Sequence, residues 1–370
     1  MPQETPTSAT IDQFFWSGRR VFVTGHTGFK GSWLCMMLAR MGATVSGYAL
    51  MPPSEPNLFE LANIGDGMTD VRGDIRDLRH LTEVMVEQDP EIVVHMAAQA
   101  LVRSSYDDPV GTYETNIMGT VNVLEAARKL KGLKALVVIT SDKCYENLEK
   151  PRGYAEDDPM GGYDPYSSSK GCAELVSAAY QKSFFSKHEN DVRVATARAG
   201  NVIGGGDWGL DRLVPDLVNS FKEGDTALIR RPDAIRPWQF VLDPLCGYLM
   251  LAERLWCGDA GFAGAWNFGP HADNERRVRE LVALAGKTWG DNAAWSIDVA
   301  LSPHEAHYLK LDVSKARNQL HWQAQLNLQQ TVAWTMNWYK VWANGGDVRR
   351  MAMVQIEEFL VLKRGPDSDR

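Results

Sequence analysis

The stretch RVFVTGHTGFKGSWL, residues 20–34, decides the fold. An apolar run leads into three glycines spaced G-x-x-G-x-x-G, and an apolar helical pattern follows. Glycine allows a tight turn and a close approach of backbone N–H groups to a pyrophosphate, and the start of a helix adds partial positive charge. The strand–turn–helix order therefore predicts a dinucleotide-binding loop. The loop residues expected to contact the cofactor are Gly25, Thr27, Gly28, Phe29, Lys30 and Gly31.

The rest of the first half alternates short apolar runs with amphipathic stretches, as βαβ units do. The expected strands are 20–24, 44–48, 68–72, 92–95, 135–140 and 192–197, and the expected helices are 32–40, 78–87, 116–131 and 166–185. Continuous Val and Ile runs suit strands that are covered on both faces. We therefore predict an α/β fold with a doubly wound, Rossmann-type parallel sheet.

After Asn201 the sequence changes character. A glycine-rich loop is followed by an expected helix at 212–222, a basic, proline-broken segment and a Trp-rich region. These features predict a second, smaller mixed α/β domain that binds the substrate. We assign residues 1–200 and about 237–262 to the dinucleotide-binding domain, and 201–236 and 263–370 to the substrate-binding domain. The ligand is expected in the cleft between them.

Composition narrows the function classes. The 370 residues are 44% hydrophobic and carry a net charge of −8, so neither nucleic acid nor an anionic membrane is an expected partner. No apolar run reaches the roughly 20 residues that span a bilayer. Five cysteines without a C-x-x-C pair favour reduced thiols and a cytoplasmic location. His304 and His307 lack a nearby third ligand, so no metal site is predicted.

The choice of dinucleotide is less direct. No acidic residue ends the second expected strand, where a ribose-binding carboxylate is typical. The stretch 41–71 also contains no Lys or Arg to bind a 2′-phosphate, although Lys30 offers one cation. We favour NAD over NADP. Asp74 follows the third strand and is expected either to accept a hydrogen bond from the adenine amino group or to cap a helix.

A second motif, Tyr166-Ser-Ser-Ser-Lys170, places both ends on one face of a helix. A phenol is a poor base near neutral pH, and a nearby ammonium favours its ionised form. Tyr166 is thus the predicted base that deprotonates a substrate hydroxyl, and Lys170 could also reach the nicotinamide ribose. Ser141, after the strand 135–140, is predicted to hydrogen-bond the substrate hydroxyl or Tyr166.

Two further ionisable groups follow Ser141. Asp142 and Lys143 come at the carboxyl end of a strand, where sites of doubly wound sheets lie. A plain dehydrogenase or epimerase needs only the Ser and Tyr, so an added acid and base indicate chemistry beyond hydride transfer. Asp142 is the candidate general acid. Lys143 is the candidate base, or alternatively a donor that stabilises an enolate.

Together these residues resemble the extended short-chain dehydrogenase/reductases, and among them the nucleotide-sugar 4,6-dehydratases. HMAAQALVRSSYDDP from His95, ETNIMGTVNVLEAAR from Glu114 and RAGNVIGGGDW from Arg198 resemble segments of that family. Ser141-Asp142-Lys143 departs from the Thr-Asp-Glu of the members acting on dTDP-glucose. With PWQFVLDPL and PHEAHYLKLD, it resembles the members acting on CDP-linked glucose.

The resemblance implies a lyase that oxidises a hexose at carbon 4, eliminates water across carbons 5 and 6, and reduces carbon 6 with the same bound NAD. It also implies further cofactor contacts at Ile75, Ala97 and Ala98. The implied substrate-binding residues, among which Arg236 resembles the family's phosphate-binding arginine, are Gln99, Arg103, Asn201, Leu213, Arg236, Glu305 and Tyr308.

Three other interpretations stay open from the sequence: a nucleotide-sugar 4-epimerase, a dehydratase of another nucleotide hexose, and a non-catalytic NAD-binding scaffold. The family resemblance also implies a homodimer, or a dimer of dimers, formed by the helices 116–131 and 166–185 of each subunit. The only other expected partner is the small-molecule nucleotide sugar.

Overall fold

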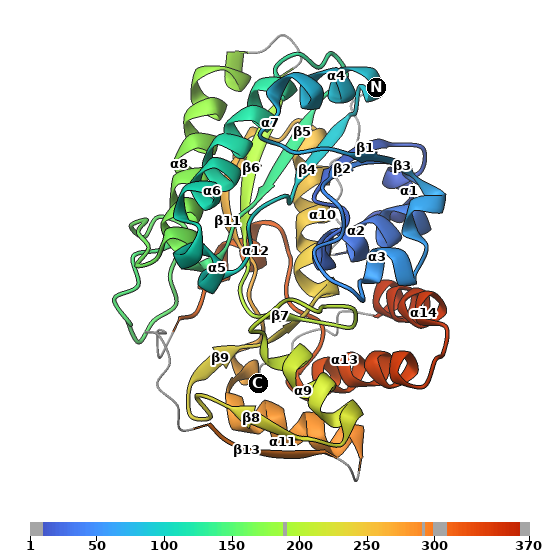
Figure 1. The fold of residues 1–370 in the computed structure, drawn as a ribbon. Helices are drawn as coiled ribbons and strands as arrows, with labels where there is room; N and C mark the ends of the chain where they lie inside the picture. The colour runs from blue at the N-terminus through green and yellow to red at the C-terminus, as the bar shows by residue number, and fades with distance from the viewer. Residues whose placement is uncertain (1–9, 188–190, 291–292, 299–308, 363–370) are drawn as a thin grey trace.

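A seven-stranded parallel sheet forms the centre of the computed structural model, which describes residues 10–187, 191–290, 293–298 and 309–362 (Figure 1). Its strand order is β11-β6-β5-β4-β1-β2-β3. β1 and β4 are neighbours in the sheet but are not consecutive in the chain, because the chain crosses from β3 at one edge to β4 beside β1. The sheet is thus divided into two halves between β1 and β4, as in doubly wound folds. The strands are β1 (Arg20–Thr24), β2 (Thr44–Ala49), β3 (Thr69–Arg72), β4 (Ile92–His95), β5 (Ala135–Ile139), β6 (Arg193–Arg198) and β11 (Gly264–Asn267).

Alternate residues of each strand enter different cores, because successive side chains of a strand point to opposite faces. In β1, Val21 and Val23 belong to one hydrophobic cluster, whereas Phe22 belongs to the other. In β4, Val94 and Val93 divide in the same way. Both faces are thus covered, which explains the continuous apolar runs in the sequence.

Helices from distant parts of the chain cover the two faces (Figure 1). On one side the cluster includes α2 (Phe29–Arg40) and α10 (Leu242–Trp256). On the other side it includes α4 (Leu78–Gln88) and α7 (Gly119–Ala127), with α8 (Pro165–Ser183) packed against α7 and β6. The shorter helices around the sheet are α1 (Gln13–Trp16), α3 (Leu58–Leu61), α5 (Val102–Asp107), α6 (Pro109–Tyr113) and α12 (Ser314–Gln319).

A smaller set of elements gathers at one end of the molecule (Figure 1). Three two-stranded sheets pair β7 with β10, β8 with β13 and β9 with β12. The strands are β7 (Val202–Ile203), β8 (Thr226–Ile229), β9 (Ile235–Pro237), β10 (Gln239–Phe240), β12 (Glu275–Arg277) and β13 (Ala294–Ile297). The helices there are α9 (Leu213–Glu223), α11 (Val278–Trp289), α13 (Leu328–Ala343) and α14 (Val348–Val361).

Single turns complete the chain and shape its loops. A π-helical turn, η2 (Glu114–Met118), precedes α7, and a 3-10 turn, η3 (Asp142–Cys144), follows β5. The remaining 3-10 turns are η1 (Ile64–Gly67), η4 (Phe185–Lys187), η5 (Ala260–Phe262) and η6 (Ala272–Asn274). Among the described residues, no helix combines the length and the apolar character needed to span a bilayer.

The predicted doubly wound sheet is confirmed, and each of its six predicted strands lies within one residue of the observed bounds. Two local differences stand out. The helix expected at 116–131 begins with the π turn and ends at Ala127. β11, which the sequence grouped with the smaller domain, joins the large sheet beside β6, because this pairing is between segments distant in sequence. The division into two domains otherwise stays a prediction.

Candidate active site

Ser141 and Asp142 lie at the carboxyl end of β5. The Ser141 hydroxyl donates to Asp142 Oδ1 over 2.9 Å, and it accepts the backbone N–H of Lys143 over 3.2 Å. Asp142 is only 3% exposed, and its carboxylate packs against Gly200, where a Cβ would overlap it. Lys143 is exposed. The structure therefore brings Ser141 and Asp142 into a shared buried corner and leaves Lys143 on the accessible side of the turn.

Tyr166 and Lys170 project from the start of α8. Asp164 caps this helix by accepting the Ser167 N–H over 2.9 Å, and Pro165 occupies the first turn, where a missing N–H costs nothing. Lys170 is 7% exposed and donates from Nζ to the Ile139 carbonyl over 3.3 Å. The Ser141 hydroxyl lies near the Tyr166 phenol and acts to lower its pKa. Helix α8 and the end of β5 thus meet at the predicted catalytic residues.

Burial dominates the ionisation of this corner. It raises the pKa of Tyr166 to about 12, while the Ser141 hydrogen bond and the Arg212 charge act in the opposite direction. Burial, aided by the Lys30 charge, lowers the pKa of Lys170 to about 7, and Glu174 opposes it. The sequence-based expectation of a lowered phenol pKa is therefore not what the protein groups alone produce. The cation that acts on Tyr166 is Arg212, and desolvation outweighs its charge.

The glycine loop forms a close-packed cradle. Gly25 has φ +75°, and a Cβ there would lie 2.7 Å from the backbone nitrogen of Ala97. A Cβ on Gly31 would overlap the Gly25 carbonyl oxygen, so only glycine fits either position. At Gly28 the nearest atom to a Cβ would be 3.5 Å away, which leaves open space beside the N-terminus of α2. This cradle fits a dinucleotide pyrophosphate.

Four other predicted cofactor residues lie in or beside the cradle. Thr27 donates from Oγ1 to the Leu50 carbonyl over 3.0 Å, which ties the loop to the end of β2. The Ala97 N–H donates to Thr24 Oγ1 over 3.2 Å, and Ala98 follows it in the same loop after β4. Phe29 begins α2 and lies beside Gly204.

Lys30 belongs to the catalytic side of the loop. Its pKa is lowered to about 8 by burial and by the Arg212 charge, whereas Asp142 and Asp207 raise it. The alternative role for Lys30, binding a 2′-phosphate, is not supported by these neighbours, since that phosphate would lie near the end of β2. The arrangement agrees with NAD rather than NADP.

At the expected adenine end, Asp74 is already engaged. Its carboxylate pairs with Arg76 at 2.6 Å, and this pairing lowers the pKa of Asp74. The helix cap proposed for Asp74 is provided instead by Asp77, which accepts the His80 N–H over 3.1 Å. Ile75 is buried, and its side chain fills the space that a Cβ on Gly119 would need.

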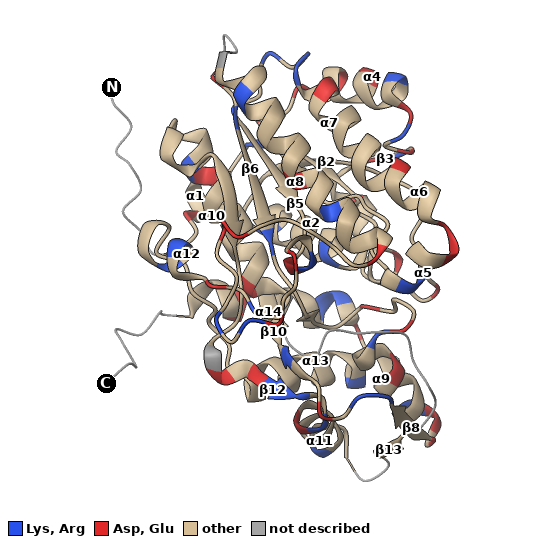
Figure 2. Ribbon diagram, turned by 90° about the vertical axis from the view of Figure 1, so that its left-hand side faces the viewer, with Lys and Arg blue, Asp and Glu red and all other residues tan. Residues whose placement is uncertain are grey.

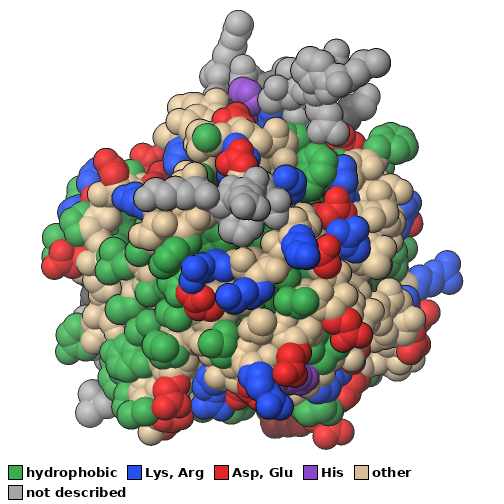
Figure 3. Space-filling view, turned by 90° about the horizontal axis from the view of Figure 1, so that it is seen from above, with side chains coloured by type: hydrophobic (Ala, Val, Ile, Leu, Met, Phe, Trp, Pro, Cys, Tyr) green, Lys and Arg blue, Asp and Glu red, His purple; other side chains and the backbone are tan. Residues whose placement is uncertain are grey.

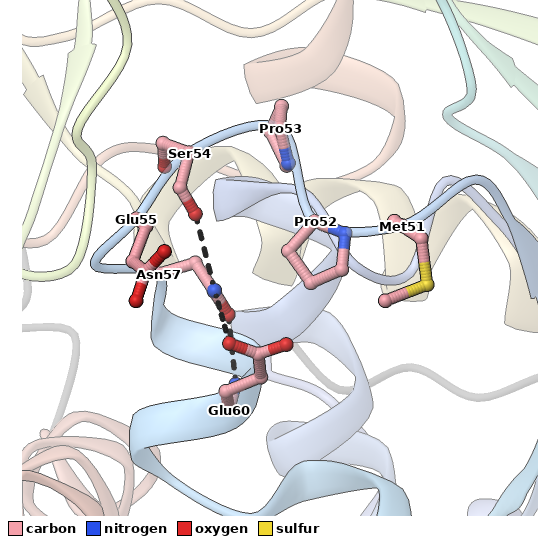
Figure 4. A pocket seen from close by; sticks show the side chains of 7 residues that line it. All are labelled: Met51, Pro52, Pro53, Ser54, Glu55, Asn57 and Glu60. Carbon is pink, nitrogen blue, oxygen red and sulfur yellow. Dashed lines mark hydrogen bonds between the residues drawn. The ribbon is translucent and has the colours of Figure 1, made fainter.

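A pocket of about 300 Å³ opens beside the loop after β2 (Figure 4). Asn57 organises it by donating to the Ser54 carbonyl over 3.1 Å and to Glu60 Oε2 over 2.8 Å. The lining residues, none of which is a predicted site residue, are Met51, Pro52, Pro53, Ser54, Glu55, Asn57 and Glu60.

The predicted substrate residues have different environments. Gln99 Nε2 donates to the Leu101 carbonyl of its own loop and to Thr112 Oγ1 of α6, each over 3.0 Å. Arg103 pairs with Asp211 at 2.8 Å, and Arg230 shares the same carboxylate at 3.2 Å. Asn201 adopts a left-handed conformation with φ +51° at the turn into β7.

Leu213 begins α9, and Arg236 lies on β9 with Nη1 donating to the Ile235 carbonyl over 3.0 Å. Glu305 and Tyr308, like His304 and His307, lie outside the described residues. Charges of both signs are interleaved over the whole ribbon, so electrostatic guidance of an anionic ligand would depend on local groups (Figure 2).

Comparison with known proteins places this geometry in a family. The model of the GDP-mannose 4,6 dehydratase family matches residues 22–335, which includes the end of β1, the glycine loop, β5 and α8. The chain belongs to this family. Its membership confirms the resemblance to the nucleotide-sugar dehydratases of the extended short-chain dehydrogenase/reductase type.

Within the dehydratase family, the chain is 51% identical over 353 residues to the CDP-glucose 4,6-dehydratase of Salmonella typhimurium, covering 95% of this chain and 98% of that relative. It is 27% identical to a UDP-glucose 4-epimerase of Mycolicibacterium smegmatis, covering 87% of this chain and 98% of that relative. The dTDP-glucose 4,6-dehydratase of Streptomyces venezuelae, solved with NAD bound, has a TM-score of 0.75 at 24% identity, covering 89% and 99% of the two chains. That likeness shows the shared fold.

Several charged residues near the dehydratase site were missed from the sequence. Arg212 pairs with Asp207 at 2.7 Å and acts on both Tyr166 and Lys30. The only local signal was the proximity of these two residues in the glycine-rich loop. Glu174 offered a clearer one, since it follows Lys170 by four residues and so shares its helix face.

Proposed function

We propose that this protein is a CDP-glucose 4,6-dehydratase, which converts CDP-glucose to CDP-4-keto-6-deoxyglucose and water with NAD that stays bound and is recycled. The observation that carries the proposal is the 51% identity, across nearly the full length of both chains, to the CDP-glucose 4,6-dehydratase of Salmonella typhimurium. The chain retains Ser141, Asp142, Tyr166 and Lys170 around one buried corner, as this chemistry requires.

NAD, when bound, supplies the hydride acceptor for carbon 4 and the hydride donor for carbon 6. Gly25, Gly28 and Gly31 would hold its pyrophosphate, and Lys170 would reach its nicotinamide ribose. Ser141 orients the hexose hydroxyl at carbon 4, and Tyr166 removes the proton from it. The resulting ketone acidifies the hydrogen at carbon 5, because the carbanion is delocalised as an enolate.

Elimination then needs a proton donor and a proton acceptor. Asp142 delivers a proton to the departing hydroxyl at carbon 6. Lys143 either removes the proton at carbon 5 or stabilises the enolate by donating to its oxygen. Its exposed position gives it access to a bound sugar. The product gains no net electrons, which explains why one bound cofactor suffices.

The nucleotide sugar is proposed to be bound mainly by residues of the smaller set of elements. Arg236 is the proposed partner of the diphosphate, since a guanidinium can bind phosphate oxygens in a bidentate manner. Gln99, Arg103, Asn201 and Leu213 are the other described candidates. Glu305 and Tyr308 are proposed to meet the nucleotide, and this role rests on the family resemblance.

The test is a panel of CDP-, dTDP-, GDP- and UDP-linked hexoses followed by mass measurement. We expect loss of one water from CDP-glucose and little change in the other substrates. An unchanged mass with an inverted carbon 4 would favour the epimerase. Water loss from a different nucleotide hexose would change the nucleotide assigned to the substrate. Bound NAD without turnover of any hexose would favour the scaffold.

We further propose a homodimer through α8 and the η2–α7 segment. Hydrophobic side chains gather on one side of the molecule, where Figure 1 places α6 and α8 (Figure 3). A second copy would cover exposed apolar residues of η2, α8 and the adjoining α6: Met118, Leu175, Val110 and Tyr113, which are 52%, 62%, 66% and 38% exposed. Leu175→Glu should shift the mass in light scattering to that of a monomer. An unchanged mass would contradict this interface.

A cytoplasmic location is part of the proposal. All five cysteines lie among the described residues, and none forms a disulfide. Reduced thiols are typical of a cytoplasmic enzyme.

A further inference from the structure

Glu174 and Arg198 form an ion pair in the interior beside the catalytic corner. Their side chains are 5% and 2% exposed, and Arg198 Nη2 donates to Glu174 Oε2 over 2.7 Å. Arg198 Nε donates to the other carboxylate oxygen over 2.9 Å, so the contact is bidentate. The dehydration chemistry uses neither residue. Replacing a buried ion pair by apolar residues often leaves stability unchanged or raises it, so stability alone is a weak reason for this one.

The pair connects the elements that carry the catalytic residues. Glu174 follows Lys170 by one turn of α8, and Lys170 follows Tyr166 by one turn. Arg198 ends β6, two residues before Gly200, which packs against the Asp142 carboxylate. The bidentate contact therefore joins the helix of Tyr166 and Lys170 to the strand that supports Asp142.

Both ends of the catalytic turn are bonded to this pair. The turn consists of residues 141–144. Immediately before it, the Thr140 hydroxyl donates to Glu174 Oε1. Immediately after it, the Tyr145 hydroxyl accepts from Arg198 Nη1 over 2.5 Å and donates to Asn267 Oδ1 over 2.8 Å. The turn is thus anchored to one carboxylate–guanidinium unit through the side chains of the two residues that flank it.

We propose that Glu174 and Arg198 are positioning residues, which fix the Ser141–Asp142–Lys143 turn in register with Tyr166 and Lys170. Different residues carry the two steps: Tyr166, aided by Ser141, acts in oxidation at carbon 4, and Asp142 and Lys143 of the turn act in elimination across carbons 5 and 6. A shift of about 1 Å between reacting groups can cost as much as about a hundredfold in rate. Loosening the anchor should therefore uncouple elimination from oxidation. This inference rests on the proposed dehydratase function.

Two threonines provide a matched test. Thr140 and Thr196 are 3% and 4% exposed, and both donate a hydroxyl to Glu174, to Oε1 and Oε2 respectively. Thr140 adjoins the catalytic turn, whereas Thr196 lies within β6 and adjoins none of it. Valine preserves the shape of threonine and removes only the hydroxyl. Thr140→Val and Thr196→Val thus lose similar hydrogen bonds in similar surroundings and differ in their link to the turn.

In the experiment, each enzyme with bound NAD carries out a single turnover of CDP-glucose, and the reaction is quenched with borodeuteride. Mass spectrometry then measures the ratio of deuterated hexose to 6-deoxyhexose. Deuterated hexose reports oxidation without elimination. In Thr140→Val we expect the hexose fraction to rise about fivefold, as the loss of one hydrogen bond of ordinary strength predicts. Thr196→Val should keep the wild-type ratio with a comparable fall in melting temperature.

Tyr145→Phe is the second variant, because it releases the other end of the turn and leaves the ion pair intact. It should raise the hexose fraction as Thr140→Val does. Equal ratios in Thr140→Val and Thr196→Val, or a wild-type ratio in Tyr145→Phe, would overturn the positioning role. If wild-type enzyme forms no 6-deoxyhexose, the proposed function fails instead, so the two failures are distinguishable.

Discussion

Alanine substitutions in the glycine loop separate its role in folding from its role in cofactor binding. At Gly31 a Cβ would lie 2.8 Å from the Cα of His26, whereas carbon atoms in contact are separated by about 3.5–4.0 Å. The backbone must therefore move by about 1 Å. Such overpacking costs about 1–3 kcal/mol, and the gain in helix propensity of about 1 kcal/mol offsets part of it.

Gly28 differs because the protein leaves room for a side chain there. A Cβ would be 3.5 Å from its nearest neighbour, and φ is −78°, which alanine adopts readily. As an N-cap, alanine is somewhat worse than glycine, so Gly28→Ala should cost no more than about 1 kcal/mol of stability. The new methyl group would occupy the space of the pyrophosphate. Losing one hydrogen bond to that charged group, about 1.5–3 kcal/mol, weakens NAD binding by about tenfold to a hundredfold.

The assay combines urea unfolding of NAD-free protein with calorimetric titration of NAD. We expect Gly31→Ala to lower both stability and affinity, and Gly28→Ala to lower affinity almost alone. Gly67→Ala is the control, since nothing lies within 4 Å of its Cβ position, and it should change neither. Wild-type NAD affinity in Gly28→Ala would refute the assignment of this loop as the pyrophosphate cradle.

Four further predictions follow from the titratable groups. Asp142→Asn should slow water loss and retain oxidation, and Lys143→Met should retain oxidation while losing solvent-deuterium exchange at carbon 5; unchanged exchange would exclude Lys143 as the base. Lys170→Met should abolish oxidation and change the pH dependence of stability. Unfolded lysine keeps its proton up to about pH 10.4, whereas the folded-state pKa is about 7, so unfolding takes up a proton between these values and wild-type stability rises with pH. The urea midpoint of the variant should not show that rise with pH. Midpoints of variant and wild type that change with pH in parallel would contradict the lowered pKa of Lys170. Burial raises the pKa of Glu253 to about 8, so the folded protein binds more protons than the unfolded chain between about pH 4.3 and 8, and stability falls with rising pH there. Glu253→Gln keeps an acceptor for Trp16 Nε1 and should remove this fall, as melting temperatures at pH 5 and pH 8 can show.

The sheet and the glycine loop could be predicted because their signals are local. The apolar run of β1, the turn glycines and the start of α2 lie within fifteen residues. The register of β11 beside β6 could not, because it pairs segments separated by many residues. The contacts between charged groups also differ in how local they are. Lys170 and Glu174 are close in sequence and share a helix face, so their proximity could be predicted. Arg103 and Asp211 are 108 positions apart in the sequence, so their contact could not.

The direction in which a side chain points is the other property that could not be predicted from the sequence. Lys30 was assigned to the cofactor loop, yet its electrostatic neighbours are Asp142, Asp207 and Arg212. Which way a side chain leaves a helix end depends on what packs against it, here the loop after β7. For Tyr166, the sequence identified the phenol and the nearby ammonium, but the size of the desolvation effect required the surrounding packing.

Two kinds of ion pair surround the catalytic corner, and their energetics suit different tasks. Glu174–Arg198 is almost fully buried, so breaking it would leave an uncompensated charge at a cost of about 3–5 kcal/mol. Arg103–Asp211 is about 40% exposed on both sides, and such pairs contribute about 0–1 kcal/mol. The first pair is poorly suited to exchanging partners during turnover, whereas Arg103 can leave Asp211 at little cost. A dehydratase needs both, because the three chemical steps require fixed groups and a charged substrate must enter and leave.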